Sequence, residues 1–207
     1  MTPEKSAAPR RTQADRRAQT RAALLEAAAR GISREGYGNL VLERVASDAG
    51  YTRGALYHHF ADKEALALAV VGWGKLTWQR EVGIVGAREP DPVKALLAMA
   101  RAHAVYCRRD VARLMMVLRI ELGVGDDPVA RAVDDTIEEG FAFTGPMIQA
   151  GRDSGAIPPG PPVRIISQAY MGVLEGLMIQ IAGETDYDED LAEGVVRAVL
   201  GLPPAAA

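Results

Sequence analysis

Arg53, Tyr57 and His58 are the residues whose types and spacing point most directly to recognition chemistry. Offsets of four and five positions put all three on one side of a helix. An arginine can donate two hydrogen bonds to a guanine edge, and tyrosine and histidine can reach a base edge or a phosphate. Thr52 is placed to cap this helix, and small Gly54 lets it approach a groove wall closely. We therefore predict a helix that enters the major groove of double-stranded DNA.

The residues around this helix fit a helix-turn-helix, in which two short helices meet at a fixed angle. We predict helices at Leu42–Ala49 and Arg53–Phe60, with Ala46 small enough for close packing. Gly50 lies in the turn, where a left-handed backbone costs other residues about 1 kcal/mol or more. Buried contacts between the two helices are expected from Val45, Ala49 and Leu56. On its own, this pattern also fits a helical hairpin in a wider bundle.

From Arg21 to Leu66 the sequence resembles the DNA-binding domain of the TetR/AcrR transcriptional regulators. The matching segments are Leu24–Ala28 with Glu35–Tyr37, Val45–Ala46 with Ala49–Gly50, and the long run Leu56–Leu66, which reads LYHHFADKEAL. The resemblance implies a ligand-responsive repressor that binds a palindromic operator as a dimer. It also implies that certain residues face DNA or orient those that do, namely Arg53, Gly54, Tyr57, His58, His59 and Lys63.

The helix Leu42–Ala49 opens differently from the family pattern. One or two Thr or Ser residues usually stand there, whereas this chain has Leu40 and Val41. We expect Asn39 to cap the helix instead and Arg44 to contact a phosphate.

Charge is divided unevenly along the chain. Residues 1–63 contain eleven basic and seven acidic residues, whereas residues 64–207 contain thirteen basic and twenty acidic residues. A basic end and an acidic body fit a chain of which only one end faces a polyanion, although uneven solvated charge is an alternative. Residues 1–15 lack apolar periodicity, and we predict a flexible basic arm there. Five arginines in and near this arm could follow the DNA backbone or enter the minor groove, with a role in solubility alone as the alternative. They are Arg10, Arg11, Arg16, Arg17 and Arg21.

Apolar residues recur at helical spacing, without strand-like alternation or an internal repeat. The chain is therefore predicted to be all-α, with about nine helices. They are expected at residues 16–36, 42–49, 53–60, 62–86, 92–105, 110–122, 128–152, 163–182 and 188–200, with caps at Asp62 and Asp91 and a bend at Pro146. The predicted domains are the arm (1–15), the helix-turn-helix domain (16–66) and a helical effector-binding and dimerisation domain (67–207).

The segment Val163–Ala182 is too apolar for an ordinary surface helix. The resemblance implies a homodimer formed by the C-terminal helices, and small Gly172 and Gly176 would let helices approach closely. An internal core helix is the alternative. The predicted dimer seam consists of Tyr170, Gly172, Val173, Gly176, Leu177, Gln180 and Ile181.

The resemblance further implies a pocket for a small-molecule effector. Bulky residues on apolar helices are the candidates for its wall, with plain core as the alternative for each. His103 and Arg119 need partners on such faces, and Glu121, Glu175 or another protein group can supply them. The candidate residues are Trp73, Trp78, Met99, His103, Tyr106, Met115, Met116, Arg119, Phe141, Phe143, Met147 and Tyr170.

Several classes of protein are not indicated. The single Cys107 excludes an intramolecular disulfide, and the absence of a long apolar run or secretory signal predicts a cytoplasmic protein without a membrane partner. No catalytic motif, cofactor motif or metal-ligand spacing is present, and adjacent His58 and His59 do not suit a metal. The remaining alternative is a helical adaptor or scaffold that binds protein instead of DNA.

Overall fold

The computed structural model describes residues 12–180 and 186–205, and within these ranges all regular structure is helical. The predicted all-α fold is confirmed. The elements are α1 (Gln13–Glu35), α2 (Leu42–Asp48), α3 (Arg53–His59), α4 (Lys63–Trp78), a π-helical segment (Gln79–Gly83), α5 (Ile84–Arg88), α6 (Pro92–Cys107), a 3-10 turn (Asp110–Arg113), α7 (Leu114–Leu122), α8 (Pro128–Asp153), α9 (Val163–Gln180) and α10 (Asp188–Leu200). Because α4, the π-helical segment and α5 are continuous, the described chain has nine helices, as predicted.

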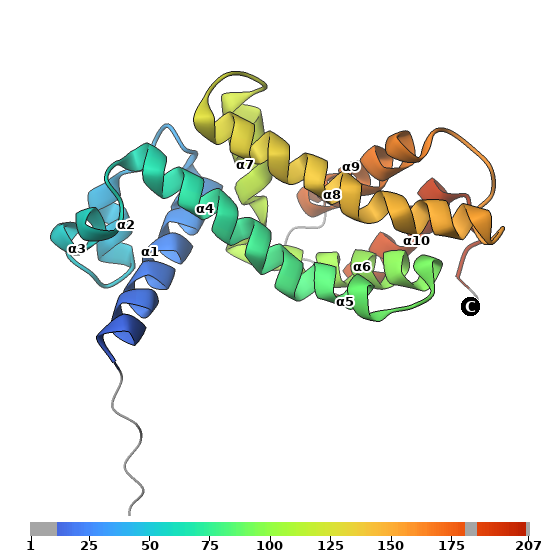
Figure 1. The fold of residues 1–207 in the computed structure, drawn as a ribbon, viewed down its shortest axis with the longest axis horizontal. Helices are drawn as coiled ribbons and strands as arrows, with labels where there is room; N and C mark the ends of the chain where they lie inside the picture. Colours follow the sequence, from blue (N-terminus) through green and yellow to red (C-terminus); the bar gives the residue numbers. More distant parts are fainter. Residues whose placement is uncertain (1–11, 181–185, 206–207) are drawn as a thin grey trace, which may run out of the picture.

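Helices α1, α2 and α3 gather at one end of an elongated molecule (Figure 1). Helix α4 starts beside them and runs into the body, where α5 to α10 pack together. The C-terminal end lies at the opposite end of the body from α1–α3 (Figure 1). The α1–α3 unit is therefore joined to the body chiefly through α4 and through contacts of α1 with the 3-10 turn and with α7.

Side-chain caps fix most of the helix starts. Thr52, Asp62 and Asp91 each accept hydrogen bonds from backbone amides in the first turn of the helix that follows, as predicted. Helix α1 begins at Gln13, earlier than predicted, because Thr12 and Asp15 form a reciprocal capping box. The last residues of the predicted arm are therefore helical, while Arg10 and Arg11 lie outside the described residues.

The prediction that Asn39 caps α2 is wrong. The N-cap position is Val41, which makes no side-chain capping bond. The Asn39 amide nitrogen instead donates to the Glu35 carbonyl oxygen over 2.8 Å. The reason is positional: Asn39 lies two residues before the cap and next to the end of α1, where carbonyl groups lack helical partners.

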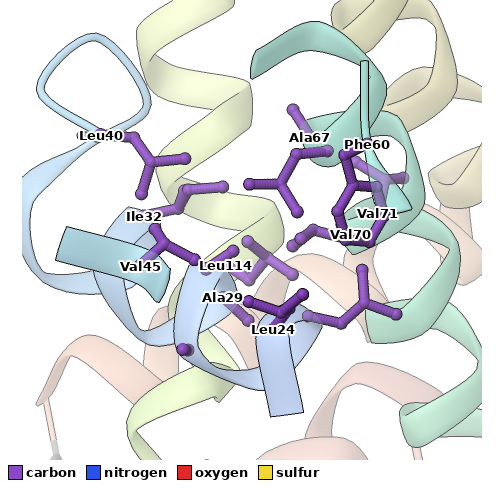
Figure 2. Close-up of a cluster of buried hydrophobic side chains, with 14 of the residues drawn as sticks. Leu24, Ala29, Ile32, Leu40, Val45, Phe60, Ala67, Val70, Val71 and Leu114 are labelled. Carbon is purple, nitrogen blue, oxygen red and sulfur yellow. The ribbon is translucent and has the colours of Figure 1, made fainter. Parts of the chain in front are cut away.

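One apolar core joins the α1–α3 unit to the body. Figure 2 shows side chains from α1, α2 and α4 packed together with Leu114 of α7. Val129 and Val133 of α8 belong to the same cluster. The residues assigned to separate domains from the sequence thus share buried contacts. A second cluster, built mainly from α6, α9 and α10, fills the far end of the body.

Candidate DNA-binding helix and effector cavity

Helix α3 presents one polar face to solvent. Leu56 is fully buried against the core, whereas Arg53, Tyr57 and His58 are exposed. The turn before the helix is as predicted, because Gly50 has a φ of +76° and open space around it. The structure therefore leaves the predicted reading face free to meet a groove, and contact with DNA remains a prediction.

Arg53 is held in place within the free protein. Its Nε lies 3.0 Å from a carboxylate oxygen of Glu43 on α2, and its guanidinium carbon lies 5.3 Å from the Tyr57 ring centre. All three side chains are at the surface. A single acidic residue thus sits beside the arginine with the best geometry for reading a base.

The other predicted DNA-binding residues have mixed surroundings. Lys63 is half-buried, donating to the Gly38 carbonyl oxygen over 2.8 Å and lying 4.9 Å from the Tyr37 ring centre. Exposed Arg44 pairs with Glu35 at 2.7 Å. Partial burial lowers the pKa of His59, with further lowering by nearby positive charges that include Arg17 and Arg21 of α1. These neighbours make the surface beside α3 basic.

The body contains a partly open cavity of about 590 Å³, within the size range of small-molecule sites. Its wall includes the end of α4 and the π-helical segment, a helix type that often occurs at functional sites. The described lining residues are Gly74, Lys75, Trp78, Gln79, Gly83, Ile84, Ala87, His103, Tyr106, Val111, Ala112, Leu114, Met115, Met116, Thr136, Ile137, Glu139, Gly140, Ala142, Phe143, Met171 and Glu175.

Half of the twelve candidate pocket residues line this cavity. They are Trp78, His103, Tyr106, Met115, Met116 and Phe143. The other six, which are Trp73, Met99, Arg119, Phe141, Met147 and Tyr170, are not among the described lining residues.

Packing explains where the aromatic members of the second group lie. Trp73 contacts the core shared with α1–α3. Tyr170 is fully buried, and its hydroxyl donates to the Leu96 carbonyl oxygen over 2.8 Å. Phe141 lies under the guanidinium of Arg164, 5.7 Å from its ring centre.

The remaining members also have partners within the protein. Met99 is fully buried in the small cluster with Val82, and Met147 packs against that cluster. Arg119 forms an ion pair with Asp134 of α8. Its partner is therefore the other protein group that the sequence left open, and the charge of Arg119 also acts on Glu175.

His103 has an aromatic partner on the cavity wall. The Trp78 indole nitrogen donates to His103 Nδ1 over 3.1 Å. Burial lowers the pKa of His103 to about 4, so the ring is neutral near pH 7. Its Nε2 is buried and has no hydrogen-bond partner among the described residues.

Few other polar groups face the cavity. Lys75 of α4 forms an ion pair with Glu139 of α8. Burial raises the pKa of Glu175, an effect that the charge of Arg119 partly opposes. The hydroxyl of Thr136 donates to the Ala132 carbonyl oxygen within α8. The wall is thus mainly apolar, with the half-buried carboxyl group of Glu175, the Lys75–Glu139 ion pair and one hydrogen-bonded histidine.

Several lining residues that were not predicted lie one helical turn from predicted ones. Gly74 and Lys75 precede Trp78 by four and three positions, and Glu139 and Gly140 precede Phe143 by the same intervals. Extending each bulky residue by the helical period would have indicated them.

An exposed face on α9 contains part of the predicted dimer seam. A Cβ added at Gly172 or Gly176 would meet nothing within 4 Å. Ile165 is 50% exposed and Ile179 is 61% exposed, at positions that follow the same helical face. Helix α10 adds an exposed glycine, Gly194, and half-buried apolar residues beside α9.

The other residues of the predicted dimer seam are not exposed on this face or lie outside the described residues. Val173 and Leu177 are half-buried against the second core cluster. The assignment of Tyr170 to the seam is wrong for the free chain, because its side chain points into that core. The side chain of Gln180 and the whole of Ile181 lie outside the described residues.

No described helix is long and apolar enough to cross a membrane. Within residues 12–180 and 186–205, no group of three or more His, Cys, Asp or Glu side chains is arranged to hold a metal ion.

The N-terminal unit is similar to a family of known proteins. Residues 24–70 match the model of the family described as bacterial regulatory proteins, tetR family. The HTH-type transcriptional repressor AcnR of Corynebacterium diphtheriae is 27% identical over 182 residues, which cover 84% of this chain and 90% of the relative.

Solved structures share the fold along most of the chain. AibR in complex with isovaleryl coenzyme A and operator DNA has a TM-score of 0.70 and 22% identity, covering 90% of this chain and all of AibR. FadR from Bacillus subtilis in complex with stearoyl-CoA has a TM-score of 0.68 and 18% identity, covering 87% and 95%. Both likenesses extend through the helices that surround the cavity.

Proposed function

We propose that the chain is a transcriptional regulator of the TetR family, a ligand-responsive repressor that binds a palindromic operator as a homodimer. One observation carries this proposal. The family match covers α3, and α3 holds Arg53, Tyr57 and His58 on an exposed face while Leu56 anchors it in the core. A helix held in this way can enter a major groove as a rigid unit.

Specific binding would combine base reading with phosphate contacts. Arg53 is the side chain suited to guanine, and Tyr57 and His58 extend the same face. Arg17, Arg21 and other basic groups beside α3 would attract the backbone without regard to sequence. The repressor AcnR and the operator complex of AibR support this assignment by analogy.

The cavity is the proposed effector site. Helix α4 supplies Trp78 to its wall and begins directly after α3, so a change in the cavity can move the reading helix. The acyl-CoA complexes of AibR and FadR are precedents for ligand binding in this fold. A ligand that changes the position of α4 would alter the spacing of two reading helices in a dimer and so release the operator. A regulator of chromosomal DNA would work in the cytoplasm.

Arg53→Ala tests the DNA-binding role. We expect a loss of about 1–3 kcal/mol on the specific operator and a relaxed preference at one base pair, because a bidentate contact disappears. Arg88→Ala removes an exposed arginine from α5 in the body and serves as the matched control. Operator selection from random DNA followed by binding titrations would give both quantities. Unchanged operator affinity in Arg53→Ala would remove α3 from the interface.

A salt titration separates this function from that of a protein-binding adaptor. Phosphate contacts release counterions, so the affinity for DNA should fall steeply with salt. An adaptor would show no DNA binding with such a slope. The measurement needs only the full chain and the selected operator.

A further inference from the structure

The outer half of α1 projects beyond the core of the α1–α3 unit. Helix α1 begins at Gln13, yet its first buried side chain is that of Leu24. Residues 13–23 therefore form about three turns, roughly 16 Å of helix, without a buried side chain. The reciprocal capping box of Thr12 and Asp15 keeps this end helical. Figure 1 shows it extending past α2 and α3.

The basic residues of this segment are free of acidic partners. Arg16, Arg17 and Arg21, here called the α1 ridge, are exposed, and none forms an ion pair with a described residue. Asp15, the one acidic residue of the segment, is engaged in the capping box. Farther along the same helix, Arg30 pairs with a glutamate at 3.0 Å. The ridge can therefore bind a phosphate without first losing an ion pair.

The α1 ridge lies beside the C-terminal end of α3. Arg17 and Arg21 are four positions apart and continue the helix face that carries Leu25 into the core. The Arg21 guanidinium carbon lies 5.4 Å from the centre of the Phe60 ring, directly after α3. Burial lowers the pKa of His59, and the charges of Arg17 and Arg21 lower it further. When α3 occupies the major groove, these charges lie near a phosphate backbone that borders the groove.

The flank of α3 that is formed by α2 offers much less free positive charge. The N-cap residue Val41 has no side-chain group that can bind a phosphate. Glu43 places a negative charge in the first turn of α2. Arg44 pairs with Glu35 at 2.7 Å and lies 4.0 Å from Asp48. A phosphate would have to compete with two carboxylates for this arginine, which makes α2 the weaker anchor.

We propose that the α1 ridge, rather than α2, is the main phosphate-binding surface of the α1–α3 unit and anchors α3 on the DNA backbone. This inference rests on the proposed function, which places α3 in the groove. Contacts to phosphates fix the position of a protein on the duplex but do not read bases. The ridge therefore adds affinity on the operator and on unrelated DNA alike.

A double variant with Arg16→Gln and Arg17→Gln tests the ridge. Both positions are exposed and outside the core, and glutamine is a good helix former, so the fold should be kept. Loss of two phosphate contacts should weaken binding at least about tenfold in 0.1 M salt and reduce the slope of log affinity against log salt by about 2. The loss should be equal on the operator and on unrelated DNA. Lysine at both positions keeps the charges and should retain most of the slope.

Two single substitutions complete the comparison. Arg44→Gln removes the basic residue of α2 and should reduce the slope by less than about 0.5. Arg30→Gln is the matched control on α1, because it removes an arginine that is already paired within the helix. It should leave the slope unchanged.

Uncharged methylphosphonate groups, placed one at a time in the operator, locate the contacts. A methylphosphonate at a phosphate bound by the ridge should weaken binding of the wild type but not of the double glutamine variant, since its charged partner is already gone. Phosphates bound by other elements should affect both proteins equally.

Three results would overturn the inference while leaving the proposed function intact. Arg44→Gln could reduce the slope more than the double variant does, or both proteins could be sensitive at the same phosphates. A loss that appears only on A·T-rich flanks would indicate minor-groove insertion instead. If the wild type shows no salt-dependent DNA binding, the proposed repressor function itself is wrong, and the inference falls with it.

Discussion

At the scale of single residues, Glu43 controls the surroundings of Arg53. The pair is exposed, so it contributes at most about 1 kcal/mol to the stability of the fold. Its consequence for DNA is larger in principle, because Glu43 places a negative charge next to the helix that must approach phosphates. The same charge restricts the positions that the Arg53 guanidinium can take between Glu43 and the Tyr57 ring.

Glu43→Gln should therefore strengthen binding to all DNA and weaken discrimination between sequences. We expect affinity for unrelated DNA to rise by severalfold and affinity for the operator to rise less. Titrations on both DNAs at two salt concentrations would measure the ratio. Glu26→Gln, which removes the partner of Arg30 on α1, is the matched control for a lost surface charge. A rise of equal size on both DNAs would show that Glu43 does not position Arg53.

His103 makes stability depend on pH. Its pKa is about 4 in the folded protein and near 6.5 in an unfolded chain, and the adjacent Tyr106 stays neutral because burial raises its pKa to about 12. Between these two values the unfolded chain binds a proton that the folded protein does not. Stability should therefore fall as the pH drops from 6.5 to 4, by about 3 kcal/mol for this group.

Urea unfolding of His103→Phe across this range should show a smaller loss of stability than the wild type. Glu175→Gln supplies a comparison of opposite sign. Burial raises the pKa of Glu175, so the folded state binds the proton more tightly and stability falls as the pH rises through its titration. Replacing it should raise stability at neutral pH. Parallel pH curves for the wild type and His103→Phe would contradict the burial of a neutral imidazole.

At the scale of elements, α7 connects the cavity with the loop before α2. Its first residues, Leu114 to Met116, line the cavity. Near its other end, the Glu121 carboxylate accepts hydrogen bonds from the backbone amides of Tyr37 and Gly38, the first over 2.6 Å. Lys63 donates to the carbonyl of the same Gly38. A ligand that displaces Met115 would therefore pull on the segment that orients the helix-turn-helix.

Glu121→Ala should weaken the coupling between ligand and operator without removing either binding reaction. A coupling residue of this kind changes the ratio of operator affinities, with and without ligand, by about 0.5–2 kcal/mol. A compound that binds in the cavity, added at saturation, provides the ligand-bound state. Glu121→Gln keeps one acceptor oxygen and should give an intermediate ratio. If Glu121→Ala leaves the ratio unchanged, the connection through α7 carries no signal.

The elements themselves were more predictable than their contacts. The helix starts could be predicted from nearby residues, because Asp62 and Asp91 accept hydrogen bonds from backbone amides only two or three residues away. Whether an apolar side chain lines the cavity or packs in the core could not be predicted from nearby residues. Met99 and Met115 have the same side chain on apolar helices, yet the first packs into a cluster with Val82 and the second lines the cavity. Only the arrangement of whole helices decides between them.

Polar contacts between residues far apart in the sequence could not be predicted either. Arg119 pairs with Asp134 on the next helix, and Glu121 binds amides more than eighty residues earlier in the chain. Sequence spacing within one helix contains no information on either contact. By contrast, the exposed face of α3 followed from Leu56 alone, since burying one side of a short helix leaves the other side free.

At the scale of the whole molecule, α9 and α10 leave an apolar face without a partner in the single chain. Ile165 and Ile179 are largely exposed on α9, with Gly172 and Gly176 between them. Helices with small residues at four-residue intervals can approach closely, which suits a bundle of two helices from each protomer. A two-fold axis at this face would pair two copies of α3, as a palindromic operator requires.

Gly176→Arg should convert the dimer to a monomer. The added side chain has open space in a single chain, so the protomer should fold normally, but it would place a long charged group inside the seam. Gly72→Arg is the matched control, because Gly72 is also an exposed helical glycine with open space, on α4 away from α9. Sedimentation at micromolar concentration should give dimers for the wild type and Gly72→Arg and monomers for Gly176→Arg. Operator affinity should fall with the dimer, since one reading helix cannot span half-sites about 34–36 Å apart. A monomeric wild type, or a Gly176→Arg variant that remains dimeric, would place the seam elsewhere.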